Sequence, residues 1–453
     1  MLFSAAGLAA LALMQAPAAP LDFEAARALA RERYPAILAA RFQSSAAHRQ
    51  ADAAGVWADP VVGVQLWNMP LNHIEGALHP GMTPSQRAVT LAKGPDMIPI
   101  MVMAQQTFPW PGKRGAAQRE ARAVAHQQEA QVQLLIADVD RAVAYAFAES
   151  VAASRSMETL SSTAGVLDTT VAISDARVSI NAGSPLDALT ARTERELLTR
   201  DMIDVQQQQS IARGRLASLL GFPDVAQLGL LRQSVTLAKL PPRDQLIRAA
   251  ISQRAEFKSA RAAVDAALAR AERTRLAIIP DVTANVSYMA NFGGVDSAVM
   301  GGPAGALLGP ADQVTVGVSF PLPVFALWGQ TREADAARLE HRRAEASVDA
   351  LVTAVTSEID GLLAGEAHAR AHLELHEKTL IPLSVRTVDM AQASYESGTG
   401  QLLAVVGAVR TLRSHHLDRW AAQAEYARHM ADLERATGLP LIHFVDDAET
   451  VMP

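Results

Sequence analysis

Three histidines recur at every fourth residue of a stretch with helical periodicity, at His368, His372 and His376. This spacing places three imidazoles on one helix face. Two histidines at positions i and i+4 can chelate a divalent metal ion. A solvated helix face has the same pattern without any ligand, and we favour that interpretation. The sequence therefore predicts no bound metal and no cofactor, with these three residues as the metal-ligating candidates on a helix.

Other residue patterns give no catalytic machinery. The chain has no cysteine, which excludes a thiol nucleophile, a cysteine zinc site and a disulfide framework. No phosphate loop or GxGxxG follows a strand, and no nucleophile elbow or HExxH motif occurs. We therefore expect a protein that is not an enzyme.

Composition excludes a second class. The 453 residues (48.2 kDa) carry a formal net charge of −6, with 49% hydrophobic and 5% aromatic residues. An acidic chain without a long basic stripe is not expected to bind nucleic acid. Its abundant alanine is typical of closely packed helices.

The first residues are typical of an exported protein. Residues 2–20 are apolar, and Ala16-Pro17-Ala18 fits a small-x-small cleavage site. We predict a signal peptide at 1–18; a buried N-terminal helix is the alternative. Beyond residue 20 we find no charge-free apolar run of about 20 residues, the length of a transmembrane helix.

The chain repeats itself at an offset of 220 residues. Residues 34–68 and 254–288 align without a gap, and each contains a helical stretch, a proline and an alternating run. Three more anchors follow in the same order, namely Phe108–Pro111 with Phe320–Pro323, Gly183 with Gly398, and Gly221 with Gly438. Together they predict a tandem duplication.

Both copies predict the same series of elements. We expect helices at 22–58, 114–181 and 186–220 and strands at 61–68 and 99–108 in the first copy, and helices at 243–279, 330–396 and 401–437 and strands at 281–291 and 313–320 in the second. A heptad seam comprises Leu198, Met202, Val205, Gln209, Ala212, Leu216 and Leu219. The predicted organisation is a signal peptide (1–18), a first repeat (21–221), an equatorial linker (222–239), a second repeat (240–438) and a tail (439–453).

The four predicted strands have the length and alternation of a membrane wall. Each has about 8–11 residues, and a tilted strand needs roughly 9–11 to cross a bilayer. Four strands cannot close a barrel, and lipid does not tolerate open sheet edges. If these strands span a membrane, several chains must share one barrel. The alternative is a small soluble sheet capping a helical bundle.

With these features the sequence resembles the TolC-like outer-membrane factor family of Gram-negative bacteria over residues 21–438. The resemblance rests on the duplicated element order, the segments Gln106–Arg114 and Ser319–Gln330, the two glycine turns, and the helix ends at Gly221 and Gly438. The PxPGK form of the first segment is most similar to the heavy-metal-efflux branch. The lipid-anchor cysteine of many relatives is missing.

The resemblance implies a mainly α-helical fold with a membrane β-barrel portion. Three chains would form a 12-stranded β-barrel, four strands from each, continued by an α-helical barrel of long hairpins through the periplasm. Such a homotrimer would be the passive outer-membrane duct of a tripartite efflux pump for drugs or metal ions. Its partners would be a periplasmic adaptor, an inner-membrane transporter of the resistance–nodulation–division type and outer-membrane lipid. The alternative is a soluble periplasmic coiled-coil adaptor or scaffold.

Particular residues then gain candidate roles. Gly183 and Ser184, with Gly398 and Thr399, would form the periplasmic hairpin tips that dock the adaptor, and we expect φ > 0 at both glycines. Asp187, Leu402 and Leu403 would line the pore constriction, with Asp187 forming an acidic ring in a trimer. Asp187 as a helix cap or first-turn acid is the alternative. Phe108 and Trp110, in the segment Phe108-Pro109-Trp110-Pro111 at a strand end, would lie at the membrane interface.

Overall fold

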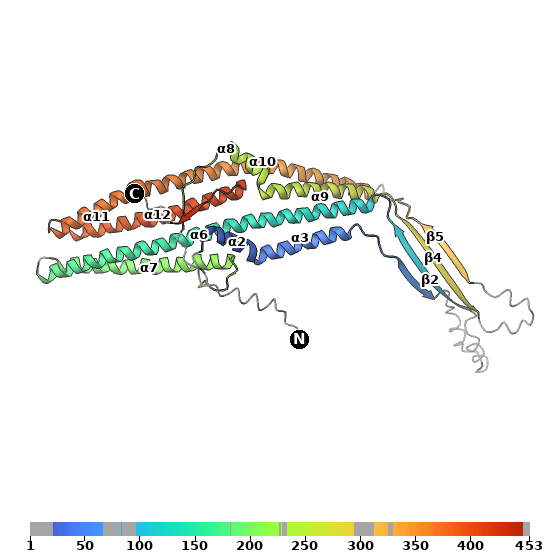
Figure 1. Ribbon diagram of the computed structural model, residues 1–453, viewed down its shortest axis with the longest axis horizontal. Coiled ribbons are helices and arrows are strands. Elements are labelled where there is room, and N and C mark those ends of the chain that lie inside the picture. Colours follow the sequence, from blue (N-terminus) through green and yellow to red (C-terminus); the bar gives the residue numbers. More distant parts are fainter. Residues whose placement is uncertain are drawn as a thin grey trace, which may run out of the picture. The chain divides into compact units, whose positions relative to one another are not determined.

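A computed structural model of the chain describes residues 21–66, 83, 97–181, 183–225, 228, 233–293, 312–324 and 329–446 (Figure 1). The predicted signal peptide lies outside these residues, as do parts of the predicted linker and tail. The chain forms two compact units. We call Met1–Ala46, Ala125–Ala263 and Ala344–Pro453 the helical unit, and Ala47–Val124 with Val264–Arg343 the strand unit.

The described elements follow the predicted order in each copy. The first copy contains α2 (Phe23–Arg33), α3 (Pro35–Ala53), β1 (Val61–Leu66), β2 (Met97–Phe108), α6 (Lys113–Ser179) and α7 (Pro185–Leu219). The second contains α8 (Arg243–Gln253), α9 (Ala255–Ala277), β4 (Val282–Gly293), β5 (Gln313–Ser319), α10 (Gln330–Leu375), the π-helical turn η5 (His376–Leu380), α11 (Ile381–Glu396) and α12 (Leu402–Thr437). Two short strands, β3 (Gln233–Val235) and β6 (Phe444–Asp446), follow the two copies.

The duplication extends to single contacts. Helices α2 and α8 both have 11 residues, and their first residues are Phe23 and Arg243. Gly221 and Gly438, which follow α7 and α12, both have φ of 71°. An added Cβ would lie 3.2 Å from Cβ of Arg33 at the first glycine and 3.1 Å from Cβ of Gln253 at the second. These two neighbours are the last residues of α2 and α8, so both copies close the same turn against the same position.

Three helices that we predicted as continuous are interrupted. The expected helix 22–58 divides at Tyr34, whose backbone is extended (ψ 119°) because a residue before proline avoids the α conformation. The expected helix 243–279 divides at Arg254, which is also extended (ψ 132°). The tract 330–396 contains the π-turn η5 between α10 and α11. Sequence periodicity continues across all three breaks, which is why it did not reveal them.

The helical unit has a core in which the ends of the two copies meet. Asp22 caps α2 by accepting a hydrogen bond from the Ala25 N–H at 2.5 Å, as the sequence indicated. Phe23 then packs its ring 5.5 Å from Phe147 of α6 and 4.6 Å from Phe444 of β6. Strand β6 pairs antiparallel with β3, so the predicted linker and tail are joined here.

Two long hairpins, α6–α7 and α11–α12, share a second core within the helical unit (Figure 1). The predicted seam contributes Leu198 and Val205 to it, with Met202 packed against them. Leu216 of the seam is fully buried in the first core instead. The polar member of the seam, Gln209, donates a hydrogen bond to Ser154 Oγ at 3.0 Å. A cross-helix hydrogen bond thus satisfies the one polar group of the seam.

The strand unit contains an antiparallel sheet in the order β1-β2-β4-β5. All four strands begin and end within two residues of the predicted bounds. Among the described helices, none combines the length and apolarity that a membrane span requires.

Candidate functional site

The four-stranded sheet presents two chemically different faces. Cross-strand register aligns Val64 with Val102, Val102 with Tyr288, and Tyr288 with Val314. One face therefore carries Val62, Val64, Val102, Ala104, Val286, Tyr288, Val314, Val316 and Val318. Val64, Val314 and Val316 are about 70% exposed. An apolar patch of this kind on an open surface marks contact with lipid or protein.

The opposite face is mostly polar. Its residues are Val61, Gly63, Gln65, Met101, Met103, Gln105, Thr283, Asn285, Ser287, Met289, Gln313, Thr315, Gly317 and Ser319. Alternation between an apolar and a polar face is the pattern of a barrel wall between lipid and a water-filled lumen. Strands β1 and β5 each have one neighbour within the described sheet, so both edges are open for pairing.

A small cluster joins the sheet to its helices. The Trp110 backbone N–H donates to Asp281 Oδ1 at 2.9 Å, and Lys113 Nζ lies 2.8 Å from the same oxygen. Asp281 therefore fixes the end of β2 and the start of α6 together. Phe108 and Trp110 remain 43% and 45% exposed at this junction. These rings are available to an interface, and their membrane contact stays a prediction.

The first hairpin turn differs from our expectation. Asn181, rather than Gly183, takes the left-handed backbone conformation (φ 57°), so the prediction of φ > 0 at Gly183 was wrong. Glycine is required there by crowding, because an added Cβ would lie 2.9 Å from Cβ of Arg177. Ser184 is the N-cap of α7 and accepts a hydrogen bond from the Leu186 N–H at 3.2 Å.

The second hairpin turn follows the prediction. Gly398 has φ of 79°, which confirms the left-handed conformation expected after a helix end. The N–H groups of Thr399 and Gly400 both donate to the Ser394 carbonyl, at 3.0 and 2.8 Å. The Thr399 hydroxyl also lies 3.0 Å from Ser397 Oγ. These bonds satisfy the carbonyls at the end of α11 and fix the turn.

Contacts between the two hairpins bring Asp187 near Tyr395. Arg177 of α6 donates to the Tyr395 carbonyl at 2.5 Å and stacks 4.8 Å above its ring. Burial raises the pKa of Tyr395, and the charge of Asp187 raises it further while Arg177 opposes it. Asp187 is half-buried in the first turn of α7, where the helix dipole favours a carboxylate. Ser184 is the N-cap of α7, so Asp187 is not needed for capping. A place for Asp187 in a pore ring is compatible with this position.

The two leucines of the predicted constriction lie in different environments. Leu402 is 1% exposed and belongs to the core shared by the hairpins. Leu403 is 66% exposed. Of the two leucines, only Leu403 has an exposed side chain that could line a pore.

Sequence reasoning missed Glu194, a buried acid that links the two hairpins. It lies on α7, is 1% exposed, and accepts a hydrogen bond from Arg410 Nε of α12 at 2.6 Å. Arg413 lies 3.6 Å from its other oxygen. Nothing in the heptad pattern distinguishes this acid from the solvated acids around it.

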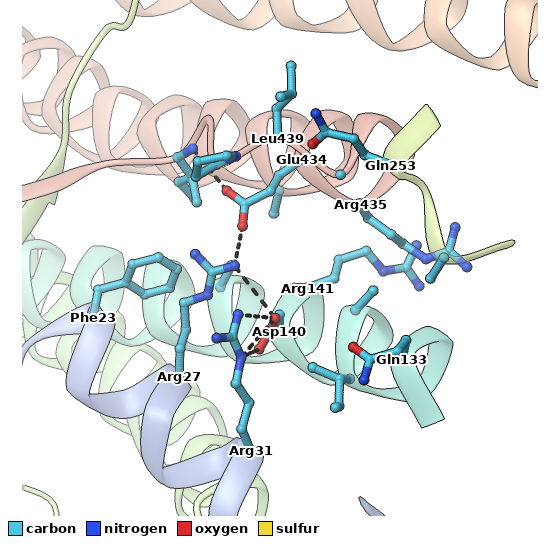
Figure 2. Close-up of a pocket in the computed structure, with 18 of the residues that line it drawn as sticks. Phe23, Arg27, Arg31, Gln133, Asp140, Arg141, Gln253, Glu434, Arg435 and Leu439 are labelled. Atoms are coloured by element: carbon cyan, nitrogen blue, oxygen red, sulfur yellow. Dashed lines mark hydrogen bonds and ion pairs between the residues drawn. The ribbon is translucent and has the colours of Figure 1, made fainter. Parts of the chain in front are cut away.

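A cavity of about 440 Å³ lies in the helical unit and is crossed by ion pairs (Figure 2). Arg27 of α2 contacts Glu434 of α12 and lies 3.6 Å from Asp140 of α6. Arg31 makes a two-pronged contact with Asp140, at 2.9 and 2.6 Å. Glu434 also accepts the backbone N–H groups of Leu441 and Ile442 at 3.0 and 3.1 Å. These acids and arginines pair with one another, although Arg27 Nε has no hydrogen-bond partner in the structure. The pairing indicates a joint between helices rather than a reactive site.

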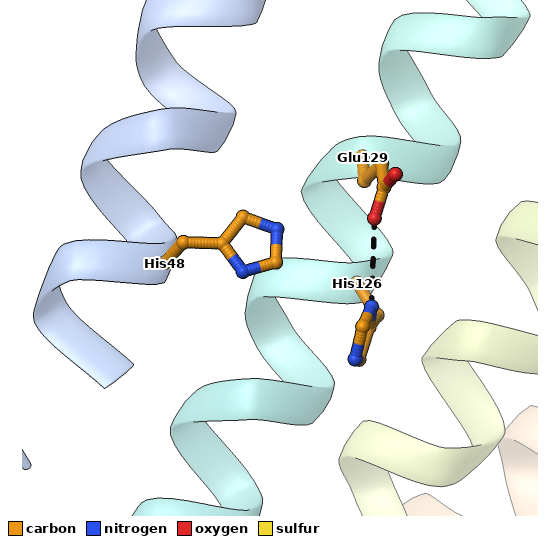
Figure 3. A group of neighbouring side chains, drawn as sticks. All are labelled: His48, His126 and Glu129. Carbon is orange, nitrogen blue, oxygen red and sulfur yellow. Dashed lines mark ion pairs between the residues drawn. The ribbon is translucent and has the colours of Figure 1, made fainter. Parts of the chain in front are cut away.

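The predicted histidines lie on one face, as expected, and a fourth histidine joins them. The rings of His368 and His372 are 6.0 Å apart, those of His372 and His376 4.8 Å, and those of His376 and His415 5.5 Å. Elsewhere, His126 Nδ1 lies 3.5 Å from Glu129 Oε2 on the exposed surface of α6 (Figure 3). His48 in that figure lies on α3, in the strand unit.

Comparison with known proteins identifies this architecture. Residues 246–439 match the outer membrane efflux protein family. The match covers most of the second copy. Among solved structures, the chain is similar to VceC of Vibrio cholerae, with 18% identity, a TM-score of 0.69, and coverage of 92% of this chain and 96% of that one. No curated protein sequence matches the chain.

Two more channels have the same fold. CmeC of Campylobacter jejuni is 15% identical, with a TM-score of 0.71 over 92% of this chain and 85% of that one. The open state of MtrE of Neisseria gonorrhoeae is 17% identical, with a TM-score of 0.68 over 92% and 88%. The resemblance to TolC-like outer-membrane factors is thereby confirmed, and the outer membrane efflux protein fold extends over both copies.

Proposed function

We propose that this chain is an outer membrane efflux protein and the channel component of a tripartite efflux pump in a Gram-negative bacterium. It would be a passive exit duct through the periplasm and outer membrane for drugs or metal ions. The observation that carries this proposal is the sheet with one valine-rich face, one polar face and two open edges. The match of residues 246–439 to the outer membrane efflux protein family supports it.

Assembly follows from the open edges. Pairing β5 of one chain with β1 of the next repeats by rotation, and such head-to-tail contacts close into a ring. Three copies would give a 12-stranded barrel whose valines face lipid and whose polar face lines the lumen. The hairpins α6–α7 and α11–α12 of a homotrimer would continue the duct as a helical barrel.

The hairpin turns would be the end that meets other proteins. The turn at Gly183 and Ser184 and the turn at Gly398 and Thr399 are tied to one another through Arg177 and Tyr395. A periplasmic adaptor would dock there and connect the duct to an inner-membrane transporter of the resistance–nodulation–division type. Three copies of Asp187 and Leu403 would line the constriction, where carboxylates favour cations and leucines resist wetting.

A soluble periplasmic adaptor or scaffold is not favoured. Such a protein would have to keep Val64, Val314 and Val316 in water, each about 70% exposed, on a sheet with two unpaired edges. Exposed edges and valine faces promote aggregation unless they are covered.

The test combines location with conduction. The chain expressed in a Gram-negative host should sediment with outer-membrane markers, and the purified protein should produce ion-conducting steps in a planar bilayer. Recovery in the soluble periplasmic fraction, with no conductance, would refute the proposal.

A further inference from the structure

Four histidine rings form a chain across two helices of the helical unit. His368 and His372 lie on α10, His376 begins η5, and His415 lies on α12. The two helices meet at the pair His376–His415, whose ring centroids are 5.5 Å apart. Asp418 lies one turn beyond His415 on α12 and presents a carboxylate to the same place.

The π-turn explains why His376 points into this contact. Pro382 has no N–H to donate to the carbonyl four residues earlier, and its ring would crowd that carbonyl. The helix widens upstream instead, and the Ile381 N–H bonds to the His376 carbonyl five residues back. His376 is then 4% exposed, whereas His368 and His372 remain exposed. Turns of this type occur frequently at functional sites.

The candidate ligand residues lie close together, and one ring nitrogen of each histidine lacks a partner. One nitrogen from each of His376 and His415 and one Asp418 oxygen all lie within 4.8 Å of one another. Nδ1 of His376 and Nδ1 of His415 are buried and have no hydrogen-bond partner in the structure. Ser414 Oγ donates to Asp418 Oδ2 at 3.2 Å, which orients the carboxylate. Buried polar atoms without partners are costly, and a bound ion would satisfy them.

Charges around the cluster are compatible with a cation. Burial lowers the pKa of His376, and the neighbouring His372 lowers it further, while Asp418 opposes the shift. The neutral imidazole is the form that binds metal. Arg419 of α12 is the nearby positive charge. Its Nε lies 3.4 Å from Glu377 Oε1, and its guanidinium stacks 3.9 Å from the centroid of the Trp420 ring, so Arg419 is engaged by other groups.

We propose that His376, His415 and Asp418 bind a divalent transition-metal ion, with Zn²⁺ as the preferred one, and that this ion links η5 to α12. Two imidazoles and a carboxylate are a common three-residue set for zinc, with water as the fourth ligand. The site differs from the His368–His372–His376 face suggested by spacing alone, because two of its three ligands come from the other helix. It does not depend on channel activity.

The test uses the full-length, tag-free protein in detergent, stripped of metal with a chelator and then titrated with Zn²⁺ in a calorimeter. One Zn²⁺ per chain should bind. His415→Gln and Asp418→Asn should each weaken binding at least about 100-fold, since losing even a group that only orients a metal ligand costs 10–100-fold. Both replaced side chains are partly or fully exposed, so these variants should fold and assemble normally.

His368→Gln is the matched control and should leave Zn²⁺ affinity unchanged, because His368 lies outside the three-residue cluster. Co²⁺ gives a second readout: its visible absorption should be intense and four-coordinate in the unsubstituted protein and lost in His415→Gln. Absence of Zn²⁺ binding, or equal affinity in His415→Gln and the unsubstituted protein, would overturn the proposal. So would a loss in His368→Gln as large as that in His415→Gln.

Discussion

Adjacent residues of β5 allow the orientation of the sheet to be tested with one pair of variants. Val316 lies on the valine-rich face and is 73% exposed, while Thr315 lies on the polar face. Val316 pairs with Val286, the fifth residue of the 12-residue strand β4, which places it near the middle of the wall. An arginine at the bilayer midplane costs about 2–4 kcal/mol. We therefore expect Val316→Arg to lower the folding equilibrium constant roughly 30- to 700-fold.

Thr315→Arg should have little effect, because its side chain would enter the aqueous lumen. In water, both substitutions would fall on an exposed surface and change stability by less than about 0.5 kcal/mol. Urea titration of protein folded into lipid vesicles, followed by tryptophan fluorescence, measures the difference directly. Equal stabilities for the two variants would contradict a lipid-facing valine surface.

Three further predictions concern the hairpins. Gly398→Ala should cost about 1–2 kcal/mol of stability, because residue 398 has a left-handed backbone. Gly183→Ala should cost a similar amount, because the new Cβ would crowd Arg177. In pull-down assays both variants should weaken adaptor docking more than trimer formation. Asp187→Ala should lower cation preference in bilayer recordings at low salt. Ser184→Ala, the control, should cost about 1 kcal/mol of stability and leave ion selectivity unchanged. Unchanged selectivity in Asp187→Ala would show that Asp187 does not line the pore. Glu194→Ala should cost about 2–3 kcal/mol in denaturant unfolding. That is less than the 3–5 kcal/mol of a fully buried pair, because Arg410 is half exposed. A loss below 0.5 kcal/mol would show that Glu194 does not hold the hairpins together.

The sequence predicted those features that local chemistry determines. Strand bounds were accurate because alternating residues between prolines and glycines have one strong interpretation. The helix starts at Lys113 and Pro185 follow turn residues that cannot continue the preceding element. The duplication was visible because the anchors kept their order, and the matching lengths of α2 and α8 agree with it.

Features that depend on pairing between distant segments were not predictable in the same way. His415 and Asp418 are about 40 residues from His376, and only the antiparallel packing of α12 on η5 brings them together. The π-turn depends on how the chain accommodates Pro382, since a proline can kink or break a helix instead. At the first hairpin turn, the left-handed position fell on Asn181, and asparagine adopts that conformation more often than most other residues.

Closure of one barrel by three chains is the central claim, and disulfide cross-linking between β1 and β5 tests it most directly. The chain has no cysteine, so a variant with one cysteine on β1 and one on β5 has no background reaction. Scanning the β1 position against Val316→Cys should reveal a register with the Cβ separation of about 3.5–4.5 Å that a disulfide needs. After oxidation, that variant should form a covalent trimer and nothing larger, while each single-cysteine variant should not form trimers. Monomers at every register, or a ladder that continues beyond three chains, would contradict the account.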